Sequence, residues 1–171
     1  MALKDDLQTA FEENLSNGGE ISDIAQVITD IYEGAVGDGK DSNGNTWTGI
    51  NYPSLKSAII AQLNISFNTS TFLQFTLIEA SLIAAWAPAI MSSLKPHPSQ
   101  SVVTTGLVTI STPVGVPPLV SESDGYDNIV DAFYDVFTKH AKTLTFTYIG
   151  IARAGSPPPP LVVPVSSFTI K

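Results

Sequence analysis

TFLQFTLIEASLIAAWAPAIM, residues 71–91, is the stretch that decides the fold. Its apolar side chains leave no polar face wide enough to meet water, so a helix here is expected to be buried on nearly every side. Its one carboxylate, Glu79, must then be paired, hydrogen-bonded or protonated, with Lys56, Lys139 or a backbone donor as the expected partner. Pro88 lies in the last turn, where its missing N–H bends or ends the helix. This helix is the expected centre of a bundle.

Further helices are expected on both sides of this stretch in the chain. Apolar residues spaced three and four apart predict them over 3–15, 21–36, 53–67 and 127–142. The third of these helices is joined to the central one by a short connection, so the two should pack antiparallel. On the last helix Asp127, Asp131 and Asp135 repeat every fourth residue, which is typical of a solvated helix face.

The remaining chain is extended in character. Residues 95–126 are rich in Val, Thr and Pro and predict one strand over 102–110, followed by polyproline-like chain. Alternating residues from Thr143 to Tyr148 predict a half-buried strand, followed by extended prolines and a short strand near Phe168.

Together these patterns predict an α+β, mainly helical fold. The expected architecture is a helical bundle around a buried central helix, with a small β-hairpin or β-sheet and Pro-rich extended arms. We expect a single domain with three parts: a helical core (1–94), an extended strand and Pro-rich arm (95–126), and a C-terminal helix with strand and Pro-rich tail that packs on the same core (127–171).

Two parts of the chain resemble each other at an offset of 42 residues. Thr105 and Leu107 align with Thr147 and Ile149, and each strand is followed by a proline turn and Leu-Val. Two interpretations are open. Either two similar arms pair side by side, or two proline-rich strand ends are alike by composition alone.

Composition narrows the function classes. Hydrophobic residues make up 43% and charged residues only 14% of the chain, against roughly 25% charged residues in typical domains, which favours an assembly component. The net charge of −8 with no basic cluster argues against binding to nucleic acid or to anionic membranes. The absence of Cys excludes disulfides and thiol chemistry. The polar N-terminal residues do not resemble a signal peptide, so we expect a chain that starts in a cytoplasm.

One loop, residues 37–49, carries a partial metal motif. Asp41, Asn43 and Asn45 alternate like the first three ligands of a calcium loop, but Thr46 stands where glycine is needed and proline stands where the last Glu is needed. The expected structure is therefore a plain turn with no cofactor, and the three residues are only weak metal candidates. Trp47 at the tip either folds back on the core or forms an exposed contact.

No catalytic motif is recognisable. His97 lies between two prolines, His140 continues the apolar stripe of the last helix, and no G-x-S-x-G turn is present. We therefore expect no enzyme. A catalytic alternative would need a cleft that contains Glu79 and His140.

Several segments resemble small structural proteins of tailed bacteriophages. They are MALKDDLQTAFEENL at 1–15, SLKSAIIAQL at 54–63, LIAAWAPAI at 82–90, and DAFYDVFTKHAKTLTFTYIGIARAGSPPPPL at 131–161. The resemblance implies a virion component of the tail, neck or capsid surface, assembled in the host cytoplasm as a homo-oligomer together with other virion proteins. The expected interaction residues are Trp47, Phe146, Tyr148, Pro157, Pro158, Pro159, Pro160 and Phe168.

The alternative function is a non-catalytic binding module. It would contact a ligand or host partner through the 37–49 loop or the 96–121 arm.

Overall fold

A computed structural model describes residues 2–16, 18–41, 44, 46–69, 73–91, 100–109, 126–152, 161–166 and 168–170. The helices in this part of the chain are α1 (Ala2–Ser16), α2 (Ile21–Gly37), α3 (Tyr52–Thr69), α4 (Phe75–Trp86) and α5 (Tyr126–Thr143). The strands are β1 (Lys40–Asp41), β2 (Trp47–Thr48), β3 (Ile90–Met91), β4 (Gln100–Thr109), β5 (Thr145–Ala152), β6 (Leu161–Ser166) and β7 (Phe168–Thr169). The α+β, mainly helical fold class is confirmed.

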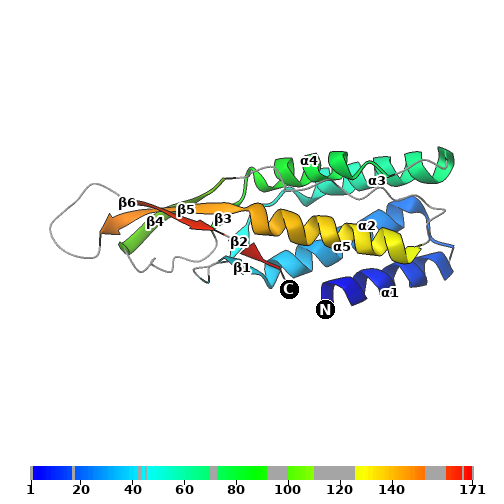
Figure 1. The fold of residues 1–171 in the computed structure, drawn as a ribbon, viewed down its shortest axis with the longest axis horizontal. Coiled ribbons are helices and arrows are strands. Elements are labelled where there is room, and N and C mark those ends of the chain that lie inside the picture. The colour runs from blue at the N-terminus through cyan, green and yellow to red at the C-terminus, as the bar shows by residue number, and fades with distance from the viewer. Residues whose placement is uncertain are drawn as a thin grey trace.

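The helices form an elongated bundle. Helices α3 and α4 run along one long side, α1 runs along the opposite side, and α2 and α5 lie between them (Figure 1). The predicted antiparallel packing of α3 and α4 is confirmed, because the hydroxyl of Ser81 in α4 donates to the carbonyl oxygen of Ser54 in the first turn of α3 (3.4 Å).

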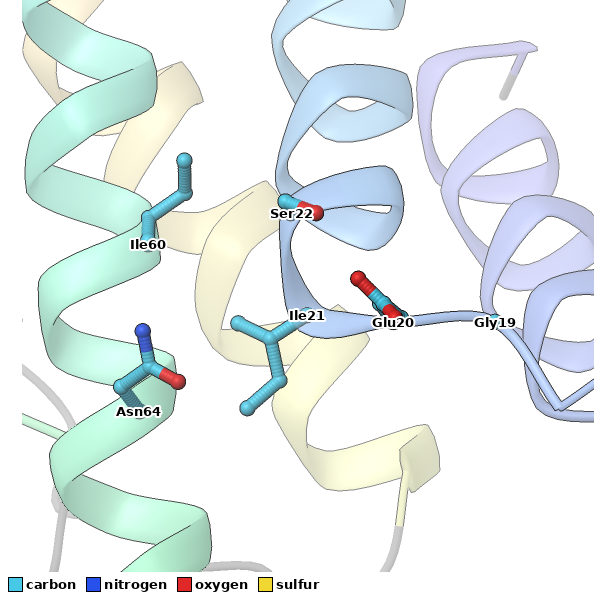
Figure 2. Close-up of a pocket in the computed structure, with 6 residues that line it drawn as sticks. All are labelled: Gly19, Glu20, Ile21, Ser22, Ile60 and Asn64. Carbon is cyan, nitrogen blue, oxygen red and sulfur yellow. The ribbon is translucent and has the colours of Figure 1, made fainter.

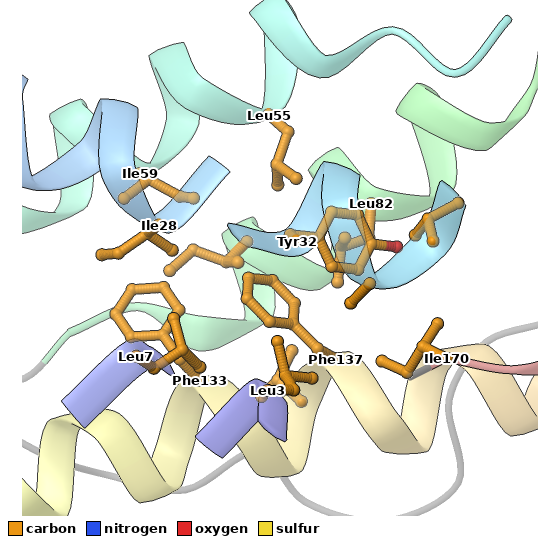
Figure 3. Packing of buried hydrophobic residues seen from close by; sticks show 14 of the residues in the cluster. Leu3, Leu7, Ile28, Tyr32, Leu55, Ile59, Leu82, Phe133, Phe137 and Ile170 are labelled. Atoms are coloured by element: carbon orange, nitrogen blue, oxygen red, sulfur yellow. The ribbon is translucent and has the colours of Figure 1, made fainter. Parts of the chain in front are cut away.

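Large side chains from every helix fill the core (Figure 3). At its centre the rings of Tyr32 from α2 and Phe137 from α5 lie 4.5 Å apart between centroids. Phe133, one turn earlier on α5, contacts Phe11 of α1 and Phe75 of α4 through its ring. Aromatic pairs of this kind add stability beyond the area that they bury.

Helix α4 is shorter and less enclosed than its sequence predicts. Phe75, Ile78, Leu82 and Trp86 are buried, whereas Leu77 is 52% exposed. The expectation of burial on nearly every side is wrong, because α4 packs mainly on α3 and α5 and so belongs to an outer layer of the bundle. None of the described helices is long and apolar enough to cross a membrane.

Three small antiparallel sheets complete the described fold. Strand β1 pairs with β7, β2 pairs with β3, and the largest sheet has the order β4-β5-β6. Only Leu144 separates α5 from β5, so the last helix leads directly into the central strand of the largest sheet, which extends beyond the ends of the helices (Figure 1).

The predicted strands 102–110 and 143–148 correspond to β4 and β5. The sequence does not predict strand β6, because Pro164 and the prolines before it interrupt the strand pattern. Proline is nevertheless tolerated here, since β6 lies at the edge of its sheet.

The two similar segments pair with each other. Thr105 lies opposite Ile149, and Leu107 lies opposite Thr147. The pairing is therefore symmetric on either side of the Gly106–Tyr148 pair: each residue faces the equivalent of the other. This pairing agrees with the interpretation of two arms lying side by side. The proline turns of the repeat, at positions 117–118 and 159–160, lie outside the described residues.

Candidate interaction surfaces

The 37–49 segment is held against the bundle by short strands. Strand β1 pairs with β7, and β2 pairs with β3. Trp47 is 3% exposed, and its Nε1 donates a hydrogen bond to Oδ2 of Asp41 (2.8 Å). A buried indole N–H needs such an acceptor. Trp47 therefore folds back on the core, and its choice as an exposed interaction residue is wrong.

The same hydrogen bond bears on the weak calcium candidates. The Asp41 side chain is buried and accepts from Trp47. Asn43 and Asn45 lie outside the described residues. Within the described part of the chain, no group of three or more acidic or histidine side chains is arranged to hold a metal ion.

Phe168 is also a core residue. It is 1% exposed, and its ring meets that of Trp86 edge-on, with 5.3 Å between centroids. The pairing of Phe168 with Asp41 in the β1–β7 sheet fixes it there. The prediction that Phe168 is an interaction residue is wrong, because the chain returns to the bundle after β6 rather than leaving it.

The other expected interaction residues have no described side chains. The backbone of Phe146 pairs with Val108 and Val165, and that of Tyr148 pairs with Gly106 and Val163. Pro157, Pro158, Pro159 and Pro160 lie outside the described residues.

The extended sheet has two edges. Strand β5 lies between β4 and β6, so the outer sides of these two strands have no strand partner within the described residues. Edge strands present a row of backbone N–H and C=O groups to which another chain can add a strand. The pairing of β4 with β5 shifts register between Gln100 and Val102 and again between Val103 and Thr105. The register shifts confine regular pairing to the half of the sheet nearer the bundle.

The acidic face of α5 contacts α1 instead of being wholly solvated. Lys4 Nζ lies 2.6 Å from Oδ1 of Asp131, and Nε2 of Gln8 donates to Oδ1 of Asp127 (2.6 Å). Asp135 pairs with Lys139 one turn later on α5 (2.7 Å). Exposed pairs of this kind contribute little stability, and those of Lys4 and Gln8 link α1 to α5. The spacing in the sequence predicted the acidic face of α5 but did not predict its contact with α1.

His140 is completely buried. Neither ring nitrogen has a hydrogen-bond partner among the described residues, and burial lowers the pKa of the imidazole to about 4. The ring is therefore neutral near pH 7 and out of reach of a substrate in this fold.

Glu79 lies on the partly exposed side of α4. Desolvation raises the pKa of its carboxyl and nearby Asp135 raises it further, while the charge of Lys139 opposes them. Lys139, one of the expected partners, is bonded to Asp135. Within the described residues Glu79 therefore interacts with this pair through charge and forms no ion pair of its own.

Among the described residues, three surface hollows are large enough for a small ligand. One, of about 470 Å³, lies between the start of α2 and the side of α3, where Ile21 and Ile60 approach each other beside Asn64 (Figure 2). Its one ionisable side chain, Glu20, forms a capping box with Asp23. Hollows of about 260 Å³ between α2 and α3 and about 580 Å³ between α5 and β7 are lined by mixed polar and apolar side chains.

The outer side of α3 and α4 is almost free of charge. Across the 18 residues of α3 and the 12 of α4, the only Lys, Arg, Asp or Glu residues are Lys56 and Glu79. Ile65 is 49% exposed and Leu77 is 52% exposed. The sequence does not reveal this surface, because its exposed positions continue the apolar composition of the buried ones and both fit the same apolar periodicity.

No family model, no curated protein and no solved structure matches this chain. The candidate surfaces therefore depend on the geometry described above.

Proposed function

We propose that the chain is a structural subunit of a phage particle, in the tail, neck or capsid surface. It acts through contacts with further copies of itself and with other virion proteins. The observation that supports this proposal best is the β4-β5-β6 sheet, which extends beyond the helices and whose outer strands, β4 and β6, have no further strand partner among the described residues (Figure 1).

A neighbour that adds a strand to β4 or β6 gains main-chain hydrogen bonds along the edge. Because α5 leads into β5 through Leu144 alone, a force on the sheet is carried into the helix that packs on α1 and α4. A subunit of this design transmits load between its neighbours and its own core. The low charge of the chain suits such a role, since few ionised groups lose water on assembly.

The test is the presence of the chain in purified particles. Gradient-purified phage from cells that express the chain during infection should contain it at a constant ratio to the major capsid protein, measured by quantitative mass spectrometry. The ratio should survive a high-salt wash, which removes weakly adsorbed proteins. Recovery of the chain only in the soluble fraction of infected cells would overturn the proposal.

The binding-module alternative has less support. Burial of Trp47 removes the largest apolar side chain of the 37–49 loop from the surface. Of the 96–121 arm, only residues 100–109 are described, and they form β4 of the extended sheet.

A further inference from the structure

We infer that two copies of the chain associate through the outer surface of α3 and α4, with like surface against like. The α3–α4 face is defined by the exposed residues Ala61, Ile65, Leu77, Ala80 and Ala84. The inference deepens the proposed function, on which it rests, by naming one of the subunit contacts and its occupant.

The exposure of this face is the first observation. About half of the Ile65 and Leu77 side chains meets solvent. Because α3 and α4 are antiparallel and joined by a short connection, both residues lie near the same end of the helix pair. The three alanines add no long side chain, so a second pair of helices can approach closely. Exposed apolar side chains grouped on one face are typical of a protein interface.

The charge distribution of the chain indicates that the partner of the α3–α4 face is a second copy. The chain has a net charge of −8, yet Lys56 and Glu79 cancel within α3 and α4. The exposed sides of α1 and α2 are acidic, with Asp5, Asp6, Glu12, Glu13, Asp23, Asp30 and Glu33. A basic partner would be attracted to those acidic sides, whereas a second copy of this acidic chain is repelled there. The α3–α4 face is the helical surface on which two like-charged copies can meet without that repulsion.

The area is that of a weak, transient contact. At about 1.5 Å per residue α3 is about 27 Å long and α4 about 18 Å long, and each helix presents a strip about 10 Å wide. The face then offers about 450 Å² per copy, or about 900 Å² in a pair, which is the size of weak and transient interfaces. A pair of this size fits a concentration-dependent dimer that is reinforced by further contacts in an assembly.

The decisive experiment uses opposite charges at one position. Light scattering of the purified full chain across a concentration series should show a mass that rises from monomer to dimer. Ala80→Glu and Ala80→Lys should each weaken the dimer at least tenfold, since both retain the helix and place like charges at the interface. Mixing the two variants should restore dimers, because opposite charges then face each other. The matched control is Gln26→Glu on the exposed side of α2, which should dimerise like the wild type.

Other results would overturn the inference. A wild-type monomer at the highest soluble concentration excludes the self-contact, as does a dimer that Ala80→Glu leaves intact. Dimers lost in both variants and not restored by mixing would mean that the face meets a different surface. Circular dichroism establishes that each variant remains helical. If the chain is present in particles but monomeric in solution, the inference fails alone; if it dimerises but is absent from particles, the proposed function fails alone.

Discussion

The indole Nε1 of Trp86 donates a hydrogen bond to the hydroxyl of Tyr32 across 2.8 Å, at a point where both side chains are completely buried. This bond joins α4 to α2 across the bundle core. Burial raises the pKa of the Tyr32 hydroxyl well above its ordinary value, while the hydrogen bond to Trp86 opposes the shift. The hydroxyl therefore stays protonated and serves as an acceptor.

Tyr32→Phe should lower the free energy of unfolding by about 1–3 kcal/mol, because it leaves the buried indole N–H without an acceptor. Urea denaturation measures the change. In Tyr32→Phe/Trp86→Phe the unsatisfied donor is gone, so a double-mutant cycle should give a coupling energy of about 1 kcal/mol or more. Strictly additive losses would contradict the importance of this bond.

Two glycines form a matched pair for a second prediction. A Cβ at Gly39 would lie 2.6 Å from Cε1 of Phe168 and 2.7 Å from the carbonyl oxygen of Thr169, whereas a Cβ at Gly34 on α2 would have no atom within 4 Å. Gly39→Ala should therefore reduce stability by about 1–3 kcal/mol through overpacking. Gly34→Ala should increase it by about 0.5–1 kcal/mol, because glycine is a poor helix former. Thermal unfolding of both variants checks the pair, and equal shifts would contradict the close approach of β7 to Gly39.

The sequence predicted the helices well, because their stripes depend on neighbours three and four residues apart. It failed at Phe168 because the β1–β7 pairing joins residues more than 120 positions apart, and no local pattern records such a contact. For Trp47 it left burial and exposure open, and the structure decides for burial through the hydrogen bond to Asp41. It also failed on the exposed side of α4. Leu77 and buried Ile78 are both apolar and differ only in the direction in which they point, so an apolar sequence cannot distinguish a core face from a solvent-exposed one.

The C-terminal residues give a third prediction. Phe168→Ala should cost about 3–5 kcal/mol, since the ring is buried against Trp86. Thr169→Ala, at the neighbouring exposed position, should change stability by less than about 0.5 kcal/mol. Removal of residues 154–171 deletes this buried ring together with β6 and β7, so it should destabilise the bundle itself, and loss of oligomers on that truncation would not identify an arm contact. Wild-type stability of Phe168→Ala in urea would refute this account.

Burial of His140 makes the stability of the folded chain depend on pH. The pKa of its imidazole is about 4 in the fold, because of burial, against the ordinary value of 6.5. Between these values the unfolded chain binds a proton that the folded chain does not, so stability falls as the pH is lowered from about 6.5 to 4, by up to about 3 kcal/mol. His140→Leu removes this contribution and the unsatisfied ring nitrogens together. The free energy of unfolding of His140→Leu, measured in urea at several pH values, should therefore rise relative to that of the wild type as the pH falls below 6.5. Carboxyl groups titrate in both proteins and cancel in the difference, so a constant difference across that range would contradict the burial of a neutral histidine.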